Sequence, residues 1–313
     1  MEILRYSKNI TLPDKKRYIA LGVFDGVHLG HQKLIKKVVE KAKQNKGISI
    51  VVTFEPHPDK VITSTHQRIF LLTPQNEKTK LIQNLGVEIL LIVNFDKALR
   101  KMSPEHFIQK ILVNKLKVHE LFVGFNFKFG FQGRGNVEYL KEMGNKYNFK
   151  TTIIRPVISN HTIISSTKIK EFIQQGDILQ AKKFLGYNLM FSGKIIQGKG
   201  RGKDLLNVAT ANVRLPRDKI NPSNGVYLVI TNIKNCKYYG LMNVGTRPTF
   251  NEINRTIEIH LLDFNQDIYK QDLSFVIIKK IREEKYFSNV DLLKEQIKKD
   301  IAYARKLIAK KTI

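Results

Sequence analysis

The feature that most constrains the fold of this chain is a regular alternation, from Arg17 to Arg155, of short apolar runs with helical patterns. Such alternation is typical of strand–helix–strand units, whose strands pair in parallel within a sheet covered by helices. A helix is predicted over residues 32–43, and strands are predicted over residues 18–21, 50–54, 89–93, 121–123 and 152–154. The first half of the chain is therefore expected to form an open α/β domain.

Two helices are expected to follow this alternating region. Ser165 or Ser166 can cap the first helix, which ends near Gln174. Asp177 can cap the second helix, which ends near Gly186. We place a domain boundary after Gly186, so that residues 1–186 form one domain and residues 187–313 the other.

The second half of the chain has a different pattern. Apolar runs separated by Gly, Pro and Asn cover residues 190–196, 226–230, 238–244, 256–262 and 273–281. This pattern favours a small antiparallel β-barrel. Ser288 with Asp291 resembles a capping box. A closing helix is predicted from one apolar stripe, formed by Leu293, Ile297, Ile301, Ala304 and Ile308.

The charge of the chain raises the question of a nucleic-acid partner. Lys and Arg number 54 against 27 Asp and Glu, which gives a formal charge of +27. Clustered cations bind phosphate backbones by releasing counterions. Here the lysines are spread over the whole length, as on a solvated surface, and neither an RNA-recognition signature nor a zinc-finger spacing is present. We therefore expect no specific nucleic-acid binding.

Other sequence features bear on location. No apolar run has the length of a membrane span, and the first residues lack the pattern of a signal peptide. We expect a cytoplasmic protein without a membrane partner.

Its single cysteine, Cys236, cannot form an internal disulfide, and we interpret it as a small apolar residue in a strand. The sequence makes no prediction of oligomeric state.

A segment rich in glycine and histidine, GVFDGVHLGH over residues 22–31, links the first predicted strand to the first predicted helix. It therefore lies at the carboxyl edge of the sheet, where open α/β folds bind ligands. Its glycines allow close approach of the backbone, and free amides at a helix start suit a phosphate. His28 and His31 can face one spot and stabilise charge that develops on an attacked phosphate. A zinc site is not expected, because no Cys or Glu stands at ligand spacing.

This segment resembles the His-x-Gly-His turn of nucleotidylyltransferases, in which an acceptor phosphate attacks the α-phosphate of a nucleotide. A narrower resemblance is to the bacterial bifunctional riboflavin kinase/FAD synthetase family. It rests on three further segments in the family's order, TFEPHP at 53–58, GFNFKFG at 124–130 and ISSTKIK at 164–170. Each segment is weak alone, and together they are specific.

The resemblance implies an FMN adenylyltransferase site on a nucleotidylyltransferase-like open parallel sheet. His28 and His31 would be catalytic. The residues implied for ATP are Gly22, Phe24, Asp25, Gly26, Asn126, Ser165, Ser166, Thr167 and Lys168. Those implied for flavin are Phe54, Pro56 and His57. The family usually has arginine at Lys168 and Lys170, and lysine offers a point charge in place of a planar fork, so we expect poorer phosphate geometry.

The second half resembles riboflavin kinases. The segment GKGRGK at 198–203 does not have Walker A spacing, but residues 193–212, which end in ATAN, are similar to the family's ATP-binding segment. The match continues through residues 225–227, 242–250, 258–264 and 281–287. The resemblance implies Glu258 as the base on the riboflavin 5′-hydroxyl and Arg282 close to flavin. It implies ATP binding by Gly200, Arg201, Thr210 and Asn212, the last two also holding Mg²⁺.

Alternation of residues tests the Glu258 assignment only in part. It places Glu258 and His260 on one face of a strand, opposite the apolar Ile257 and Ile259. An exposed carboxylate and a catalytic base both fit this arrangement. Ala209 also departs from the family, which usually has proline there, so the fixed φ of proline is lost and a weaker kinase is expected.

The function implied by the resemblance is flavin cofactor synthesis. Residues 187–313 would phosphorylate riboflavin to FMN, and residues 1–186 would adenylylate FMN to FAD with release of pyrophosphate. ATP would be the co-substrate of both reactions and Mg²⁺ the metal. Three alternatives stay open: a single-activity FMN adenylyltransferase with an impaired kinase domain, a basic RNA-binding protein, and a relative of class I aminoacyl-tRNA synthetases through the His-x-Gly-His turn.

Overall fold

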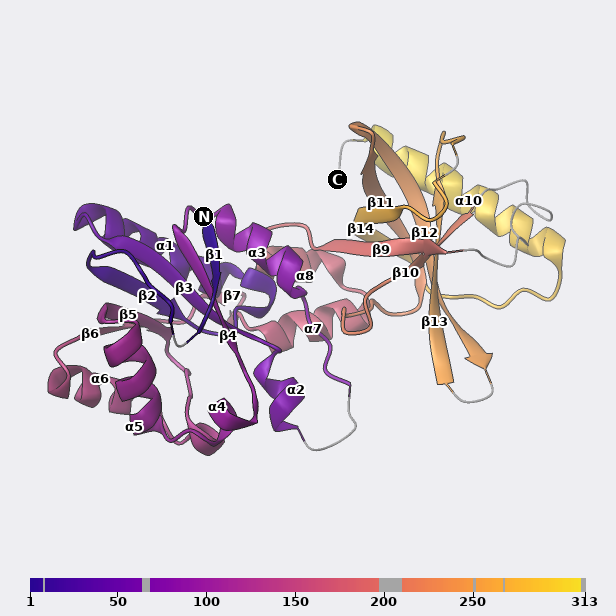
Figure 1. Cartoon of the computed structure of the whole chain (residues 1–313). Helices are drawn as coiled ribbons and strands as arrows, with labels where there is room; N and C mark the ends of the chain where they lie inside the picture. Colours follow the sequence, from indigo (N-terminus) through magenta and orange to yellow (C-terminus); the bar gives the residue numbers. More distant parts are fainter. Residues whose placement is uncertain (8, 64–67, 197–209, 250–251, 267, 311–313) are drawn as a thin grey trace. The chain divides into compact units, whose positions relative to one another are not determined.

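A computed structural model describes residues 1–310 except 8, 64–67, 197–209, 250–251 and 267, with backbone alone at 247–249 and 252–255. The chain divides into two compact units, Met1–Ser166 and Thr167–Ile313 (Figure 1). The family of folds expected from the sequence, an open parallel sheet followed by a small antiparallel barrel with a closing helix, is confirmed.

The first unit is built on a six-stranded sheet with the order β1-β4-β3-β2-β5-β6, and each neighbouring pair is parallel. Its strands are β1 (Glu2–Arg5), β2 (Arg17–Leu21), β3 (Ile48–Glu55), β4 (Ile89–Asn94), β5 (Val118–Gly124) and β6 (Lys150–Ile154). Every residue of β2 is buried, because helices cover both faces of the sheet.

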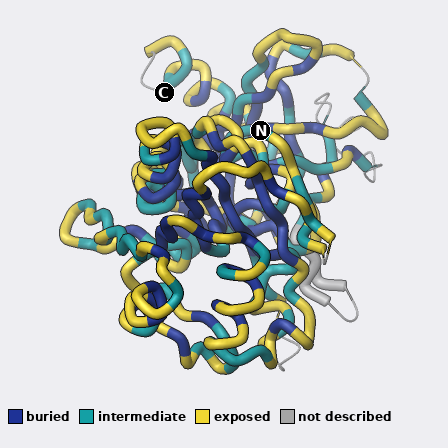
Figure 2. Tube along the Cα trace, turned by 60° about the vertical axis from the view of Figure 1, so that its left-hand side comes forward, coloured by how far each residue is buried: buried dark blue, intermediate teal, exposed yellow. Residues whose placement is uncertain are grey.

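The helices form a layer on each face of this sheet. On one face α1 (Leu29–Gln44) and α3 (Gln75–Gln83) pack against apolar side chains of the central strands. On the other face the packing helices are η2 (Phe107–Lys115), a π-helix that continues α5 (Pro104–His106), and α6 (Val137–Lys146). Figure 2 shows the buried strands between the exposed outer sides of these helices. Shorter elements are α2 (Pro58–Ile62), α4 (Lys97–Lys101), β7 (Ile158–Ser159) and β8 (Thr162–Ile163).

The order of strands fixes where a ligand can bind. From β2 the chain proceeds outward to β3 and β4, and it then returns to place β5 on the opposite side of β2. The chain after β2 leads towards β3, whereas the chain after β5 leads towards β6. The connections at the carboxyl ends of these two neighbouring strands therefore run in opposite directions. Open α/β sheets bind ligands in the crevice at such a switch point. The turn after β2 contains the glycine- and histidine-rich segment, which therefore lies at this position.

The second unit begins within the first turn of α7 (Ser166–Gln175), at Thr167, includes α8 (Ile178–Leu185), and continues as a closed barrel with the order β10-β13-β12-β11-β14-β9. Its strands are β9 (Met190–Ile196), β10 (Thr210–Arg214), β11 (Gly225–Ile233), β12 (Cys236–Thr249), β13 (Glu252–Leu261) and β14 (Asp272–Arg282). Helix α10 (Val290–Ala309) covers the outer surface of β11, β12 and β14 through Ile301, Ala304 and Ile308. The C-terminal part of the predicted apolar stripe thus packs on the barrel.

Some local expectations need correction. The cap of α10 is Asn289, whose side chain accepts a hydrogen bond from the Leu292 amide at 2.9 Å, so the capping box assigned to Ser288 is wrong. Cys236 begins strand β12 as expected, but it is exposed. The Asp177 cap of α8 is confirmed by the hydrogen bond that its carboxylate accepts from Gln180.

Candidate active sites

The turn after β2 has a strained backbone that is held by the segment before α3. Phe24 and Val27 have φ values of 55° and 36°, in the left-handed region that a β-branched residue rarely occupies. The Asp25 carboxylate accepts hydrogen bonds from the amides of Leu72 at 2.9 Å and Thr73 at 3.1 Å. Strain of this kind costs free energy and persists where the surroundings determine the conformation. The structure thus fixes this turn at the edge of the sheet.

Gly26 allows the turn to pack closely. Its φ is +80°, and a Cβ atom there would lie 2.5 Å from the Leu72 Cδ1 atom. Its amide donates a hydrogen bond to the Thr73 hydroxyl at 2.9 Å. A side chain at Gly26 would therefore strain the backbone and separate the turn from Leu72.

His28 and His31 lie against each other at the start of α1. Their rings stack with centroids 3.6 Å apart and 18° between the planes. The His31 amide donates to the His28 Nδ1 atom at 3.4 Å, so His28 is the cap of the helix. The ring of Phe24 meets that of His31 edge-on at 5.2 Å. The sequence expectation that both imidazoles face one spot is correct.

Burial keeps both imidazoles neutral at neutral pH. It lowers the pKa of His28 to about 4, against the opposing effect of Asp25. Burial also lowers the pKa of His31 well below its ordinary value, and the neighbouring His28 and Lys78 add to this. Because the His28 Nδ1 atom accepts a hydrogen bond, its proton lies on Nε2, which can donate to a ligand. The His31 Nδ1 atom is buried and has no hydrogen-bond partner among the described residues.

The other residues of the first unit that were predicted to bind ATP lie around the same edge of the sheet. Gly22 directly follows β2, and its amide donates to the Val52 carbonyl oxygen at 3.1 Å. Ser166 donates its hydroxyl to the Asp25 carbonyl oxygen at 2.8 Å and so joins the chain after Ser165 to the turn. Asn126 is exposed in the turn that follows β5, the strand next to β2.

Thr167 and Lys168 lie in the first turn of α7 within the second unit. The Lys168 ammonium is 2.7 Å from the Glu171 carboxylate and 5.3 Å from the centre of the Phe172 ring. Their role in ATP binding stays a prediction.

The predicted flavin residues of the first unit differ in their surroundings. Phe54 is buried in the core and meets the Phe95 ring edge-on at 5.8 Å. Pro56 lies just beyond β3, and His57 caps α2 by accepting a hydrogen bond from the Asp59 amide at 3.2 Å. All three come at the carboxyl end of β3, next to β2, so they lie at the edge of the sheet where the histidines lie.

Lys78 is a residue of this region that the sequence analysis did not single out. It belongs to α3 and is 4% exposed. Its ammonium donates to the Val23 carbonyl oxygen at 3.1 Å and to the Thr53 hydroxyl at 3.3 Å. A lysine among several in a polar helix gives no sequence signal of burial, and only the contacts of the folded chain reveal it.

The candidate kinase residues form a row across three strands of the barrel. Asn212 of β10 pairs with Glu258 of β13, and Glu258 pairs with Asn243 of β12. Paired residues of antiparallel strands point to the same face, so the three side chains lie side by side. Thr210 lies on that face two residues before Asn212, opposite His260. Asn243 lies within the segment at residues 242–250 that resembles riboflavin kinases. Only the pairing of β12 with β13 brings it next to Glu258.

The opposite faces of these strands are apolar, as alternation predicted. Ile257 and Ile259 are buried at 5% and 1% exposure, whereas Glu258 and His260 are partly exposed. Glu258 therefore lies outside the barrel core on an accessible surface. Such a position suits a carboxylate that must reach a substrate hydroxyl.

Arg282 ends β14, and its guanidinium is engaged with α10. It binds the buried Asp300 carboxylate, with the terminal nitrogen 2.8 Å from Oδ2 and Nε 3.0 Å from the same oxygen. A second terminal nitrogen donates to the Glu283 carbonyl oxygen at 3.0 Å. The Phe287 ring lies 5.8 Å from the guanidinium carbon. These contacts fix the start of the segment at 281–287, and the flavin role of Arg282 stays a prediction.

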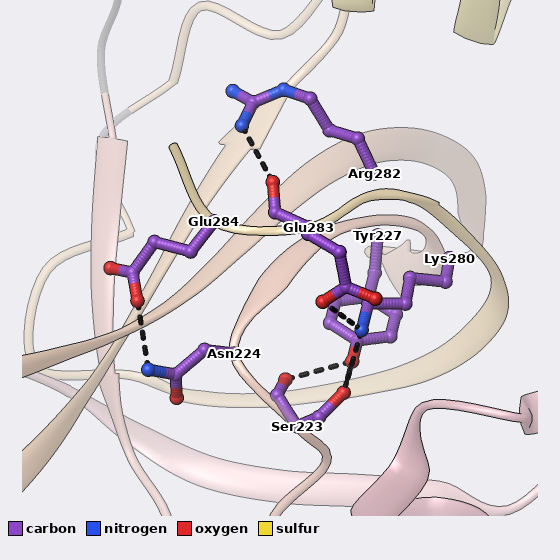
Figure 3. A network of polar contacts seen from close by, with 7 residues as sticks. All are labelled: Ser223, Asn224, Tyr227, Lys280, Arg282, Glu283 and Glu284. Carbon is purple, nitrogen blue, oxygen red and sulfur yellow. Dashed lines mark hydrogen bonds and ion pairs between the residues drawn. The ribbon is translucent and has the colours of Figure 1, made fainter. Parts of the chain in front are cut away.

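Two acidic residues that follow Arg282 are tied to the start of β11, as Figure 3 shows. Glu283 pairs with the Lys280 ammonium at 2.6 Å, and Lys280 donates to the Ser223 hydroxyl at 2.8 Å. Glu284 accepts a hydrogen bond from the Asn224 amide at 2.8 Å. The network orders the chain on the side of the barrel where Asn243 lies.

The donor set at β10 fits a magnesium ion. Thr210 offers a hydroxyl and Asn212 an amide oxygen, with the Glu258 carboxylate directly opposite Asn212. Oxygen donors of this kind are those that Mg²⁺ prefers. Gly200 and Arg201, the other predicted ATP residues of this unit, lie outside the described residues.

Comparisons with known proteins agree with both halves. The sequence model of FAD synthetase matches residues 11–168, and that of riboflavin kinase matches residues 185–308. The chain is 36% identical to the bifunctional riboflavin kinase/FMN adenylyltransferase of Buchnera aphidicola from Schizaphis graminum, over 98% of each chain. It is 36% identical to that of Bacillus subtilis, over 91% of this chain and 90% of the relative, and 33% identical to that of Escherichia coli K12, over 97% of each.

A solved structure with the same fold carries a different description. A crystal structure described as a macrolide-efflux protein from Streptococcus pneumoniae has a TM-score of 0.89 and 28% identity, covering 97% of this chain and 99% of that one. Within the part of the chain that the structure describes, no helix is both long and apolar enough to cross a bilayer.

A parallel α/β unit with a His-x-Gly-His turn, followed by a closed barrel with a kinase-like polar row, defines a two-domain nucleotide-dependent phosphotransferase. The relatives narrow this class. The chain belongs to the bifunctional riboflavin kinase/FMN adenylyltransferase family, with its FAD synthetase domain first and its riboflavin kinase domain second.

Proposed function

We propose that this chain makes FMN and FAD at two separate sites, one in each half of the chain. The functional halves are residues 1–186 and 187–313, a division supported by the family matches at 11–168 and 185–308. The observation that carries the proposal for the first half is the stacked, neutral His28–His31 pair beside the turn after β2. For the second half it is the polar row around Glu258.

In the first half, a phosphate oxygen of FMN attacks the α-phosphorus of ATP. A new P–O–P bond forms, the bond between the α-phosphorus and the bridging oxygen breaks, and pyrophosphate leaves. Neutral imidazoles at His28 and His31 donate hydrogen bonds to the phosphate oxygens on which negative charge increases. Donors of this kind, fixed before the reaction, contribute about 10²–10³ in rate each.

The turn after β2 positions these groups. Asp25 holds the turn through its bonds to the backbone amides of Leu72 and Thr73, and Gly26 leaves room for them. The start of α1, where both imidazoles lie, would suit a phosphate. Asn126, Ser165 and Ser166 would bind the nucleotide from neighbouring loops, and Phe54, Pro56 and His57 would lie near the flavin.

In the second half, Glu258 takes the proton of the riboflavin 5′-hydroxyl, whose oxygen then attacks the γ-phosphorus of ATP. ADP leaves when the bond between its β-phosphate oxygen and the γ-phosphorus breaks. A positioned base of this kind typically contributes about 10²–10⁴ in rate. Thr210 and Asn212 would hold Mg²⁺ and the ATP phosphates. The ion, when bound, would neutralise phosphate charge.

Riboflavin, FMN and ATP are the partners that this proposal requires. A cytoplasmic location accompanies the proposal, because both reactions consume ATP.

Labelled ATP tests the two reactions separately. Purified chain receives riboflavin, Mg²⁺ and ATP labelled with ³²P at either the α- or the γ-phosphorus, and the flavins are separated by chromatography. We expect γ-label in FMN, and both labels in the FAD made from that FMN. With unlabelled FMN supplied and riboflavin omitted, FAD should carry α-label alone. FAD without α-label contradicts the proposal for the first half, and FMN without γ-label contradicts the proposal for the second.

A further inference from the structure

Lys78 reaches the edge of the sheet from α3. Its ammonium lies between the connection after β2, where it donates to the Val23 carbonyl oxygen, and the end of β3, where it donates to the Thr53 hydroxyl. These bonds use two of its three N–H donors. The side chain thus brings a positive charge, buried at 4% exposure, to the edge where the stacked imidazoles lie.

Charged groups face Lys78 from every element around it. Asp25 of the turn after β2 and Glu55 of β3 favour its protonated form, whereas Lys60 of α2 disfavours it. Burial has the largest effect and lowers the pKa of Lys78 to about 8. The charge of Lys78 is in turn felt at His31 of α1, whose pKa it helps to lower.

The position of this lysine is unusual within the first unit. The buried cations that the structure describes there are Arg17 and Lys78. Arg17 begins β2 and binds the carbonyl oxygens of Leu12, Pro13 and Leu116, so it stabilises the opposite edge of the sheet. Lys78 is therefore the buried cation at the carboxyl edge. Burial of an ammonium costs free energy that a merely space-filling role would not require.

The neutral imidazoles do not supply the positive charge that a triphosphate requires. His28 and His31 donate hydrogen bonds but bring no charge, while an attacked triphosphate carries several negative charges. We propose that Lys78 is the positive charge of the adenylyl-transfer site, where it stabilises the negative charge that develops on the transferred phosphate and the leaving pyrophosphate. Lys78 keeps its proton throughout the step. The inference rests on the proposed role of the His28–His31 pair.

The test measures FAD formation from supplied FMN and ATP across pH 6 to 10 for Lys78→Met, Lys78→Arg and the control Lys80→Met, an exposed lysine of the same helix. Lys78→Met should lower kcat about a hundredfold or more at pH 7. It should leave FMN formation and the thermal midpoint of unfolding undiminished, because methionine has a similar length and no charge to desolvate. Lys80→Met should behave as the wild type.

The pH profile separates a charge from a structural support. For the wild type, kcat/KM for FAD formation should fall above pH about 8, as free Lys78 loses its proton. Lys78→Arg should retain measurable activity and move this fall to higher pH, because guanidinium stays protonated. A Lys78→Met enzyme with wild-type kcat and pH profile would overturn the inference. So would a loss of activity that follows a lowered unfolding midpoint and that Lys78→Arg does not restore.

The double variant His28→Ala with His31→Ala, in the same assay, separates failure of the proposed adenylyl-transfer site from failure of the role proposed for Lys78. If it still makes FAD at the wild-type rate, the proposed site itself is wrong. If it loses FAD formation while Lys78→Met keeps it, only the inference about Lys78 fails.

Discussion

The Cβ position of Gly30 lies 3.1 Å from the Cε1 atom of His28, so the stacked pair depends on a glycine between its two histidines. A side chain at residue 30 would require the His28 ring to shift against His31 by a few tenths of an ångström. The His-x-Gly-His turn is therefore a packing requirement as well as a sequence signature. The chemistry of the site depends on that packing.

Gly30→Ala tests this relationship. The added methyl group should displace His28 by a few tenths of an ångström or more and lower FAD formation about ten- to a hundredfold, since small misplacements are costly at reacting groups. Unfolding should change little, because alanine favours a helix. The rate of FAD formation from supplied FMN gives the readout, with FMN formation as the internal control. Wild-type FAD formation would show that the ring position is unimportant.

Acid should destabilise the first unit through His28. Its pKa is about 4 in the folded protein and 6.5 ordinarily, so between these values the unfolded chain binds a proton that the folded protein does not. Stability therefore falls as pH falls through this window, by up to about 3 kcal/mol. Hydrogen exchange of α1 amides at pH 7 and pH 5 measures this effect. His28→Gln should remove most of it, whereas replacement of the exposed His106 by glutamine should not.

Asp300→Ala should destabilise the barrel unit. It leaves the Arg282 guanidinium without its buried carboxylate and removes the acceptor of Gln296, a loss of about 3–5 kcal/mol. The control is Glu295→Ala on the same helix, which breaks an exposed pair with Lys299 and should leave stability nearly unchanged. Denaturant unfolding of both variants checks the difference. Equal stability of the two would contradict the importance of the Arg282–Asp300 pair.

Thr210→Val should weaken the response of the kinase to magnesium. Valine keeps the shape of threonine but lacks the hydroxyl, so we expect the Mg²⁺ concentration at half-maximal FMN formation to rise about tenfold. Chelation with EDTA should stop FMN formation, and added Mg²⁺ should restore it. The Mg²⁺ dependence of FAD formation from supplied FMN should not change in this variant. An unaltered response for FMN formation would remove Thr210 from the metal site.

The main strands could be predicted from the sequence because buried strands produce apolar runs or a regular alternation of apolar and polar residues. Helix-covered β3 is mostly apolar and buried at every residue before Glu55, and β13 alternates between Ile257, Glu258 and Ile259 as a half-buried strand must. Strand β1 was missed because it is short and largely exposed, so it has no apolar run. Strand β10 was assigned only as a binding segment, and its pairing with Glu258 depends on a partner about fifty residues away.

The residues of the candidate sites could be predicted where they lie close together in one local sequence motif. His28 and His31 lie in one turn, and their spacing predicted that both imidazoles face one spot, which the stacked rings of the structure bear out. Lys78 and Asn243 come to the sites from a helix and a strand that carry no local signal of chemistry. Their positions depend on strand order and on burial in the folded chain, which local sequence patterns do not reveal.

The central claim is that two independent sites act in the two units, and reciprocal variants test it most directly. Wild type, His28→Ala with His31→Ala, and Glu258→Gln are each assayed for FMN formation from riboflavin and for FAD formation from supplied FMN. The account predicts that the histidine variant makes FMN at the wild-type rate and no FAD, and that Glu258→Gln makes FAD and no FMN. Loss of both activities in either folded variant, or retention of FAD formation without the histidines, would contradict it.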